Sequence, residues 1–194
     1  LKLPKGHRFP MSKYPLLREQ LVYEGTFSKE NFFSPKKLDL EIIEKVHDKN
    51  YIQKLLSLSL NKREIRRIGF PFNKELINRE MTIAGGTIEC CLRAFDNRIS
   101  FNIAGGTHHA FSNRGEAFCL LNDQAIAAQH LINKFDIKKI LIIDLDVHQG
   151  NGTAEIFCEN TNVFTFSMHG KKNYPFQKTN SDMDIELLDG TNDQ

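Results

Sequence analysis

The sequence lacks the features that mark a membrane protein, a nucleic-acid binder or a disulfide-stabilised secreted domain. No apolar stretch approaches 18 residues, and the N-terminus carries no signal-peptide segment. The formal net charge is only +2, with the two signs interspersed, so there is no basic excess for nucleic acid. The four cysteines include no CxxC pair and are expected to be reduced thiols. We expect a cytoplasmic protein that binds neither membranes nor nucleic acid directly.

What is present is the composition of an ordinary globular domain. Of the 194 residues, 40% are hydrophobic and 26% are charged. A chain of this length can bury a substantial core, and it requires no second domain. We therefore expect residues 1–194 to form a single domain. The chain begins at Leu1 rather than Met, which suggests a trimmed start.

Hydrophobic periodicity predicts helices that alternate with strands. Apolar residues at steps of three and four predict helices at 14–24, 38–60, 76–95, 122–133 and 153–158. Apolar runs predict strands at 101–103, 140–143 and 163–167. The run at 140–143 is typical of a strand buried on both faces of a parallel sheet. This order favours an α/β fold with ligands beyond the carboxyl ends of the strands.

A pair of glycines and a charged segment each allow a local prediction. Gly85 and Gly86 fall inside a predicted helix, where close packing against a neighbour would compensate for their low helix propensity. The segment 61–68 mixes basic and acidic residues, and we interpret it as a solvated face rather than a binding patch.

The segment that follows strand 140–143 carries the strongest chemical signal. If the backbone stays extended there, Asp144, Asp146 and His148 project to one side, since side chains alternate along a strand. Two carboxylates and an imidazole together would be costly without a counter-charge, and a divalent cation would supply it. Gly150 and Gly152 permit a sharp turn beside them. The alternative is a salt-bridged strand end without a metal.

A second candidate cluster is the pair His108-His109, which follows Gly105-Gly106. Adjacent histidines can be a surface pair without a role. Beside a metal site, however, two imidazoles would provide a general base and a general acid. Asp144 and Asn151 are then candidate partners for the second ring nitrogens.

These segments together resemble the zinc-dependent histone deacetylase family, and in detail its class IV branch and bacterial relatives. The matching segments are His108-His109, Gly115-Glu116-Ala117-Phe118-Cys119 with Asn122-Asp123, Asp144-x-Asp146-x-His148-x-Gly150-Asn151-Gly152 and Ser167-Met168-His169; the class IV resemblance adds Gly6-His7-Arg8-Phe9-Pro10-Met11 and Gly69-Phe70-Pro71. The resemblance implies the arginase/deacetylase fold, a three-layer α/β/α arrangement around a mostly parallel central sheet. It covers the N-terminal two-thirds of such a catalytic domain, so the fold would be incomplete at the C-terminus.

The resemblance also implies residue roles. Asp146 and His148 match two of three ligands for zinc, with ferrous iron as the alternative in the cell. His108 and His109 match the catalytic pair, the second being the base toward a metal-activated water. Asp144 matches the carboxylate that orients His108, and Asn151 stands where the family often has an Asp facing His109.

Further positions match a substrate tunnel and an inner monovalent-cation site. Phe118, Ala117 and Tyr174 would line the tunnel for the acyl-lysine. Ala117 stands where the family usually has Gly. The cation site, usually occupied by structural potassium, matches Asp144, Asp146, His148, Ser167 and Met168.

The function implied is removal of acetyl or longer acyl groups from lysine side chains of proteins, or from small acylated amines such as acetylated polyamines. The family's third metal-binding Asp and its oxyanion-stabilising Tyr are expected beyond residue 194, so this chain alone is expected to be inactive. A non-catalytic binding module of the same fold is the rival interpretation. A dinuclear manganese hydrolase of the arginase type is disfavoured by the His108-His109 pair. The oligomeric state is left open.

Overall fold

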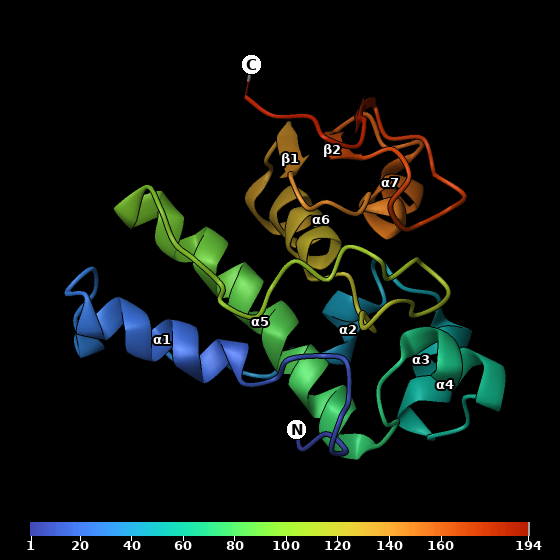
Figure 1. Ribbon diagram of the computed structural model, residues 1–194, viewed down its shortest axis with the longest axis horizontal. Coiled ribbons are helices and arrows are strands. Elements are labelled where there is room, and N and C mark those ends of the chain that lie inside the picture. Colours follow the sequence, from blue (N-terminus) through green and yellow to red (C-terminus); the bar gives the residue numbers. More distant parts are fainter. Residues whose placement is uncertain (194) are drawn as a thin grey trace.

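The computed structural model describes residues 1–193 (Figure 1). Its elements in chain order are α1 (Lys13–Tyr23), the 3-10 turn η1 (Lys29–Asn31), α2 (Leu40–Ile43), α3 (Lys49–Leu56), α4 (Lys62–Ile68), α5 (Lys74–Asn97), α6 (Asp123–Phe135), β1 (Ile140–Asp144), α7 (Asn151–Phe157), β2 (Val163–Gly170) and β3 (Met183–Leu187).

The three strands form a parallel sheet in the order β1-β2-β3, which confirms the α/β class. Asp144, the last residue of β1, lies opposite Ser167 of β2. Helices α6 and α7 cover one face of the sheet, where Ala128 and Phe157 pack with Ile142. Carboxyl ends of parallel strands meet at one edge, so the segments after β1 and β2 are brought together there.

The opposite face of β1 is exposed in the part of the chain that the structure describes. Leu141 and Ile143 are 58% and 53% exposed, while Ile142 between them is 8% exposed. The expectation that segment 140–143 is buried on both faces is therefore not met within residues 1–193. Branched aliphatic residues at every position specify a strand, but they do not specify which elements cover it.

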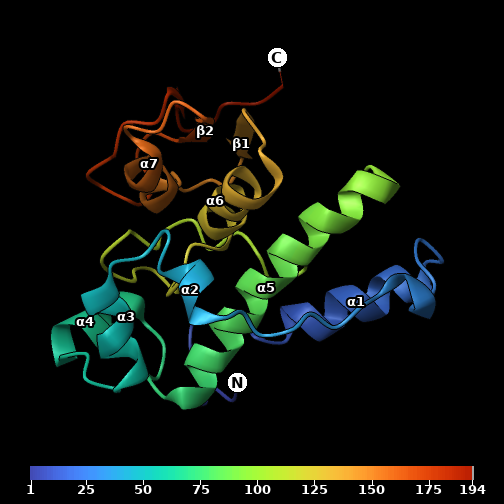
Figure 2. The same ribbon diagram turned by 180° about the vertical axis from the view of Figure 1, so that it is seen from behind.

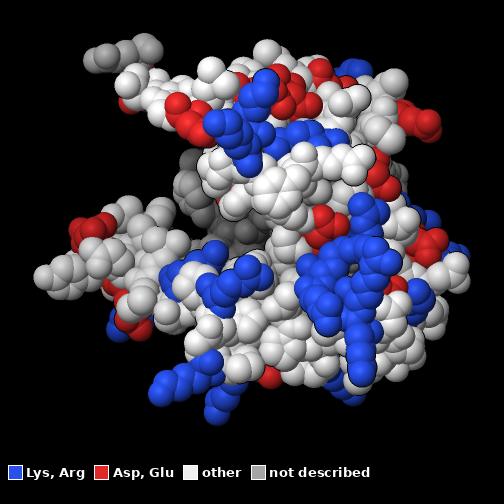
Figure 3. All heavy atoms as spheres, turned by 45° about the vertical axis from the view of Figure 1, so that its right-hand side comes forward, with Lys and Arg blue, Asp and Glu red and all other residues white. Residues whose placement is uncertain are grey.

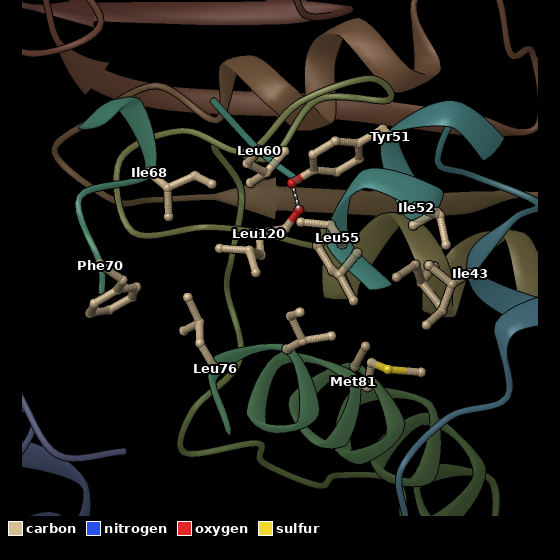
Figure 4. Packing of buried hydrophobic residues seen from close by; sticks show 14 of the residues in the cluster. Ile43, Tyr51, Ile52, Leu55, Leu60, Ile68, Phe70, Leu76, Met81 and Leu120 are labelled. Atoms are coloured by element: carbon tan, nitrogen blue, oxygen red, sulfur yellow. Dashed lines mark hydrogen bonds between the residues drawn. The ribbon is translucent and has the colours of Figure 1, made fainter. Parts of the chain in front are cut away.

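A second core lies among the helices that precede the sheet. Buried side chains of α3 and α5 meet those of the segment before α6, and the hydroxyl of Tyr51 donates a hydrogen bond to the carbonyl oxygen of Leu120 at 2.9 Å (Figure 4). The glycines of α5 pack closely, as expected. A Cβ added to Gly85 would lie 2.1 Å from the carbonyl oxygen of Lys36, so only glycine fits there.

One predicted helix is divided in the structure, and one segment without a predicted helix contains one. Segment 38–60 is divided into α2 and α3, because the carboxylate of Asp48 accepts from the backbone N–H of Tyr51 and begins a new helix. Segment 61–68 contains α4, whose first turn is closed by a capping box between Asn61 and Glu64.

The strand predictions fail at two places. Segment 101–103 is not a strand, because the side chain of Asn102 binds the backbone of Ile83 and of Ala104 instead of leaving this segment to pair. Strand β3 was not predicted. Its alternation of apolar Met183, Ile185 and Leu187 with acidic residues is the period-two signal that identifies it.

The helical core and the sheet with α6 and α7 lie on opposite sides of the segment that joins α5 to α6 (Figures 1 and 2). This segment, residues 98–122, runs between the two parts in both views and carries His108 and His109. Helix α1 projects from the body and buries none of its residues. Among the described residues, no helix has the length and apolar character needed to cross a membrane.

Candidate active site

The histidine loop is fixed by a buried carboxylate at the start of α6. Asp123, which is 1% exposed, accepts hydrogen bonds from the backbone N–H groups of Gly106 and Thr107 and from the hydroxyl of Thr107. The preceding residue, Asn122, caps α6 through the N–H of Ala125. The two residues that begin the helix therefore also set the path of the chain into His108.

The start of α7 supports the same loop from the other side. The N–H groups of Gly152 and Thr153 both donate to the carbonyl oxygen of His108, at 3.0 and 3.2 Å. A Cβ on Gly152 would lie 2.3 Å from the carbonyl oxygen of Ala110, and a Cβ on Gly150 would lie 2.2 Å from Oδ2 of Asp144. Glycine is needed at both positions for close packing rather than for turn geometry alone.

His108 is paired with the carboxylate predicted for it. Its Nδ1 lies 2.5 Å from Oδ2 of Asp144, and both side chains are 10% exposed. Burial alone would lower the pKa of His108. The hydrogen bond and charge of Asp144, together with the charge of Asp146, outweigh that effect and raise the pKa above its ordinary value.

His109 is oriented by an amide rather than a carboxylate. Its Nδ1 lies 2.7 Å from Oδ1 of Asn151, and the N–H of Gly152 donates to the same oxygen. That oxygen is thus an acceptor, so Nδ1 of His109 carries the proton and Nε2 is the free acceptor. Burial, and then the charge of neighbouring His108, lower the pKa of His109 to about 4. His109 is therefore a neutral base at pH 7.

Asp146 and His148 lie in a bend rather than on an extended strand. Strand β1 ends at Asp144. After it, the backbone N–H of Asp146 donates to the carboxylate of Asp144, and the backbone N–H of His148 donates to the carboxylate of Asp146. The assumption of an extended backbone is therefore wrong beyond Asp144, because carboxylates capture the backbone donors locally. The side chains still converge, with Oδ1 of Asp146 2.9 Å from Nδ1 of His148.

This pair fits part of a metal-binding donor set. Neighbouring ligand atoms of tetrahedral zinc lie about 3.3 Å apart when the bonds are about 2.0 Å long, close to the observed 2.9 Å. Carboxylate oxygen and imidazole nitrogen are also ligand types that catalytic zinc accepts. Within residues 1–193, no three His, Cys, Asp or Glu side chains are grouped so that they could hold an ion. Asp146 and His148 therefore remain a predicted partial site.

The predicted tunnel residues lie around these groups. The ring of Tyr174 packs edge-on against His109 and His148, with centroid separations of 5.0 and 6.2 Å. The hydroxyl of Tyr174 donates to Glu116, which also pairs with Arg114 at 3.5 Å. Burial and this contact with Glu116 raise the pKa of Tyr174, which keeps its hydroxyl protonated. The tyrosine is thus held against the histidines from a neighbouring loop.

On the other wall, Phe118 packs against Phe9 and Phe70, with ring centroids 5.3 and 5.2 Å apart. Ala117 and Phe118 both have positive φ angles, 45° and 67°. This left-handed turn explains why glycine suits position 117 in the family that the sequence resembles. The alanine methyl lies in the lining of the cavity.

The residues predicted for a monovalent cation lie at the end of β1, in the bend that follows it and within β2. Asp144 and Ser167 are register partners, and Met168 follows on β2. Ser167 is 2% exposed, and its hydroxyl contacts Nδ1 of His169 at 2.9 Å. Strand pairing thus places Asp144 beside Ser167, while the potassium site itself stays a prediction.

A cavity of about 800 Å³ joins the histidines, the Asp146–His148 pair, Phe118 and Tyr174. Sequence reasoning assigned no role to four residues that shape it. Glu116 anchors Tyr174, Arg66 and Arg67 line the opening although their segment was interpreted as solvated, and Asp123 fixes the histidine loop. A carboxylate next to a helix cap and two glycines before a histidine pair are the signals available for Asp123. No sequence signal locates the arginines.

Comparison with known proteins matches residues 7–192 to the family model of the histone deacetylase domain. An uncharacterised protein of Picosynechococcus sp. is 42% identical over 191 residues, covering 98% of this chain and 64% of that protein. Histone deacetylase 2 of Arabidopsis thaliana is 29% identical over 97% of this chain and 51% of its own length. A crystal structure of a histone deacetylase homologue from Aquifex aeolicus shares the fold, with a TM-score of 0.80 at 23% identity, over 96% of this chain and 56% of the homologue. The chain thus spans between about half and two-thirds of the length of these relatives.

Proposed function

Because this chain belongs to the histone deacetylase family, we propose that it forms part of a metal-dependent amidohydrolase that removes acyl groups from lysine side chains. The observation that carries the proposal is a pair of histidines with different hydrogen-bond partners and oppositely shifted pKa values, in one cavity with Asp146 and His148. A fold shared by a family hosts many functions, so the proposal depends on this site rather than on the fold.

His109 is the general base of the proposed reaction. Its Nδ1 proton is held by Asn151, its Nε2 is free, and its pKa of about 4 keeps it neutral at pH 7. It can therefore accept the proton of the attacking water. An amide partner orients the ring without adding a negative charge, which would raise the pKa of His109.

His108 complements it as a proton donor. Asp144 stabilises its charged form and raises its pKa, so this imidazole carries a proton under conditions where His109 does not. The two rings lie 4.1 Å apart between centroids. Two titratable groups whose pKa values are pushed apart are what acid and base roles require, and the pair can deliver a proton to the leaving amine.

Asp146 and His148 would hold the divalent ion, which we propose to be zinc. When bound, zinc polarises the amide carbonyl and lowers the pKa of water toward about 7. Tyr174 packs against His109 and His148, while Phe118 lies on another part of the cavity wall, so the acyl-lysine would pass between aromatic side chains.

The test is a series of acyl substrates offered to the full-length protein. Peptides carrying acetyl-, octanoyl- or myristoyl-lysine, and acetylated polyamines, would be compared by the rate of deacylation, with His109→Ala as the matched control. We expect at least one acyl-lysine peptide to be hydrolysed by the unaltered protein and none by the variant. If metal-loaded protein binds the peptides but hydrolyses none of the series, the rival interpretation as a non-catalytic binding module would replace this one.

A further inference from the structure

Basic side chains surround the cavity that holds the histidines. Arg8, Lys13, Arg66 and Arg67 line it, and all four are exposed. Within residues 1–193, none of the four forms an ion pair with a carboxylate. We call these four residues the cationic rim.

The carboxylates that line the same cavity have partners outside the cationic rim. Glu116 accepts from the hydroxyl of Tyr174 and pairs with Arg114, and Asp146 is bound to His148. A further lining cation, Arg79, is paired with the buried Glu80. Neither carboxylate pairs with a residue of the rim, and the cavity lining carries five Lys or Arg side chains against these two carboxylates.

The rim lies beside the tunnel wall rather than on a remote surface. The N–H of Ala117 donates to the carbonyl oxygen of Arg67, and the N–H of Phe118 donates to that of Ile68. These bonds attach the end of α4, which carries Arg66 and Arg67, to the turn that places Phe118. The guanidinium of Arg8 lies 5.8 Å from the centre of the Phe118 ring.

The side of the molecule that carries α3 and α4 comes forward in Figure 3. Lys and Arg side chains gather in clusters there, with few acidic side chains between them. Exposed like charges that lie within one Debye length, about 8–10 Å at physiological salt, add to a common field. That field attracts anions to the opening and repels cations.

We propose that the cationic rim selects acyl-lysine in an acidic peptide segment, with Asp or Glu close to the modified lysine. This inference rests on the proposed deacylase function and names its substrate class. Carboxylates that flank the acyl-lysine pair with Arg66 and Arg67 while the acyl chain enters between the aromatic walls. Acetylated polyamines and lysine-rich segments bring positive charge to a positive opening and are disfavoured.

The test uses three acetyl-lysine peptides that differ only in whether Asp, Ser or Lys flanks the acetyl-lysine. With the full-length protein, we expect the Asp peptide to have the lowest KM, about tenfold below that of the Lys peptide, at similar kcat. Raising the salt from low to high concentration should shrink this difference, since screening weakens exposed charge pairs.

Variants on one helix provide the control. Arg66→Gln with Arg67→Gln should reduce the preference for the Asp peptide about three- to tenfold, while Arg63→Gln, on the same helix but outside the cavity lining, should leave it unchanged. Arg63→Gln should also retain the kcat of the unaltered protein with all three peptides, because Arg63 lies outside the cavity lining.

Binding separates this inference from the proposed function. Fluorescence anisotropy with the His109→Ala variant measures the same peptides without turnover. Tighter binding of the Asp peptide supports selection by the cationic rim. If no peptide is hydrolysed by the unaltered protein, this result still supports the rim's selectivity, while the deacylase proposal fails. Equal affinity for the three peptides, or a preference for the Lys peptide, overturns the rim whether or not hydrolysis occurs.

Discussion

The two sides of the cavity differ in how firmly the protein's own hydrogen bonds hold them. His108 and His109 are 8% and 5% exposed, and the rings are fixed by Asp144, whose side chain is 10% exposed, and by the buried Asn151. Asp146 and His148 have side chains 51% and 42% exposed and bind mainly each other. The proton-transfer side is preorganised by the fold, whereas the metal-binding side is a bend with two donors facing one another.

This difference indicates what holds the side chains in place on each side of the cavity. Orienting a base requires fixed hydrogen bonds, which Asp144, Asn151 and the glycine contacts provide. A pair of metal ligands gains its order from the ion, because ligand bonds replace local hydrogen bonds once the ion binds. Substitutions on the two sides should therefore have separable effects on metal content, stability and turnover.

The largest effect is expected on the exposed side. His148→Ala should reduce bound zinc from one equivalent per full-length protein to none and abolish turnover, since one of two local donors is lost. The unfolding temperature of the metal-free protein should change little, because this side chain is partly exposed. Elemental analysis and thermal unfolding measure both properties. Unchanged zinc content would contradict the assignment.

The buried side can be disturbed by a single methyl group. In Gly150→Ala, the new Cβ would lie 2.2 Å from Oδ2 of Asp144 and displace the partner of His108. We expect a loss of about 2–3 kcal/mol in the free energy of unfolding, as for an overpacked core, together with a lower kcat. Urea unfolding measures the first quantity.

The comparison variant is Gly190→Ala, where φ is +84°, against −73° at Gly150, and where no atom lies within 4 Å of the new Cβ. It should cost about 1 kcal/mol through backbone strain alone. Equal losses in the two variants would show that contact with Asp144 is not what position 150 avoids.

Lowering the pH should destabilise the fold around His47, which binds the backbone of the segment that carries the histidine pair. His47 donates through Nδ1 to the carbonyl oxygen of Phe111 and accepts through Nε2 from the N–H of Asn122, so it is neutral in the fold. Burial lowers its pKa to about 4. Between pH 6.5 and pH 4 the unfolded chain binds the additional proton, so stability falls as pH falls, by about 3 kcal/mol in total.

Glu80 contributes with the opposite sign, because burial raises its pKa to about 7 and the folded chain holds the proton over much of the same range. The measurement is therefore the difference in the free energy of unfolding between the unaltered protein and His47→Gln as a function of pH. Because both proteins contain Glu80, its contribution cancels in this difference. The variant should be less stable at pH 7 and should lose less stability on acidification. Parallel pH profiles would contradict the role assigned to His47.

The smallest effect is expected at the tunnel turn. Ala117 has a φ of 45°, which glycine adopts without strain. Ala117→Gly should raise the free energy of unfolding by about 0.5–1 kcal/mol in chemical denaturation. Ala110→Gly, at a buried position outside the positive-φ residues, should lower it. A destabilised Ala117→Gly variant would show that the methyl packs usefully in the cavity wall.

The parts of the fold that sequence predicts are those with strong local periodicity. The apolar stripe of residues 76–95 predicts helix α5 to within two residues at each end, because this periodicity is a local signal. Segment 101–103 looked equally apolar, yet Asn102 uses its side chain to bind the backbone. Whether an apolar run pairs as a strand depends on neighbours that composition does not reveal.

The same limit applies to the site. The pairs His108–Asp144 and His109–Asn151 were predicted and are in contact, because strand ends and glycine turns confine where these residues lie. The anchoring of Tyr174 by Glu116 joins residues 58 positions apart and has no local sequence signal. The roles of all these residues in catalysis stay predictions.

The measurement that tests the account most directly is zinc content and turnover of His109→Ala in the full-length protein. His109 is assigned to proton transfer and not to metal binding, so the two properties should separate. We predict one equivalent of zinc per protein and a loss of kcat of at least about a hundredfold, as for removal of a general base. A variant that loses its zinc, or that keeps near-normal kcat, would contradict the division of the cavity into a metal-binding side and a proton-transfer side.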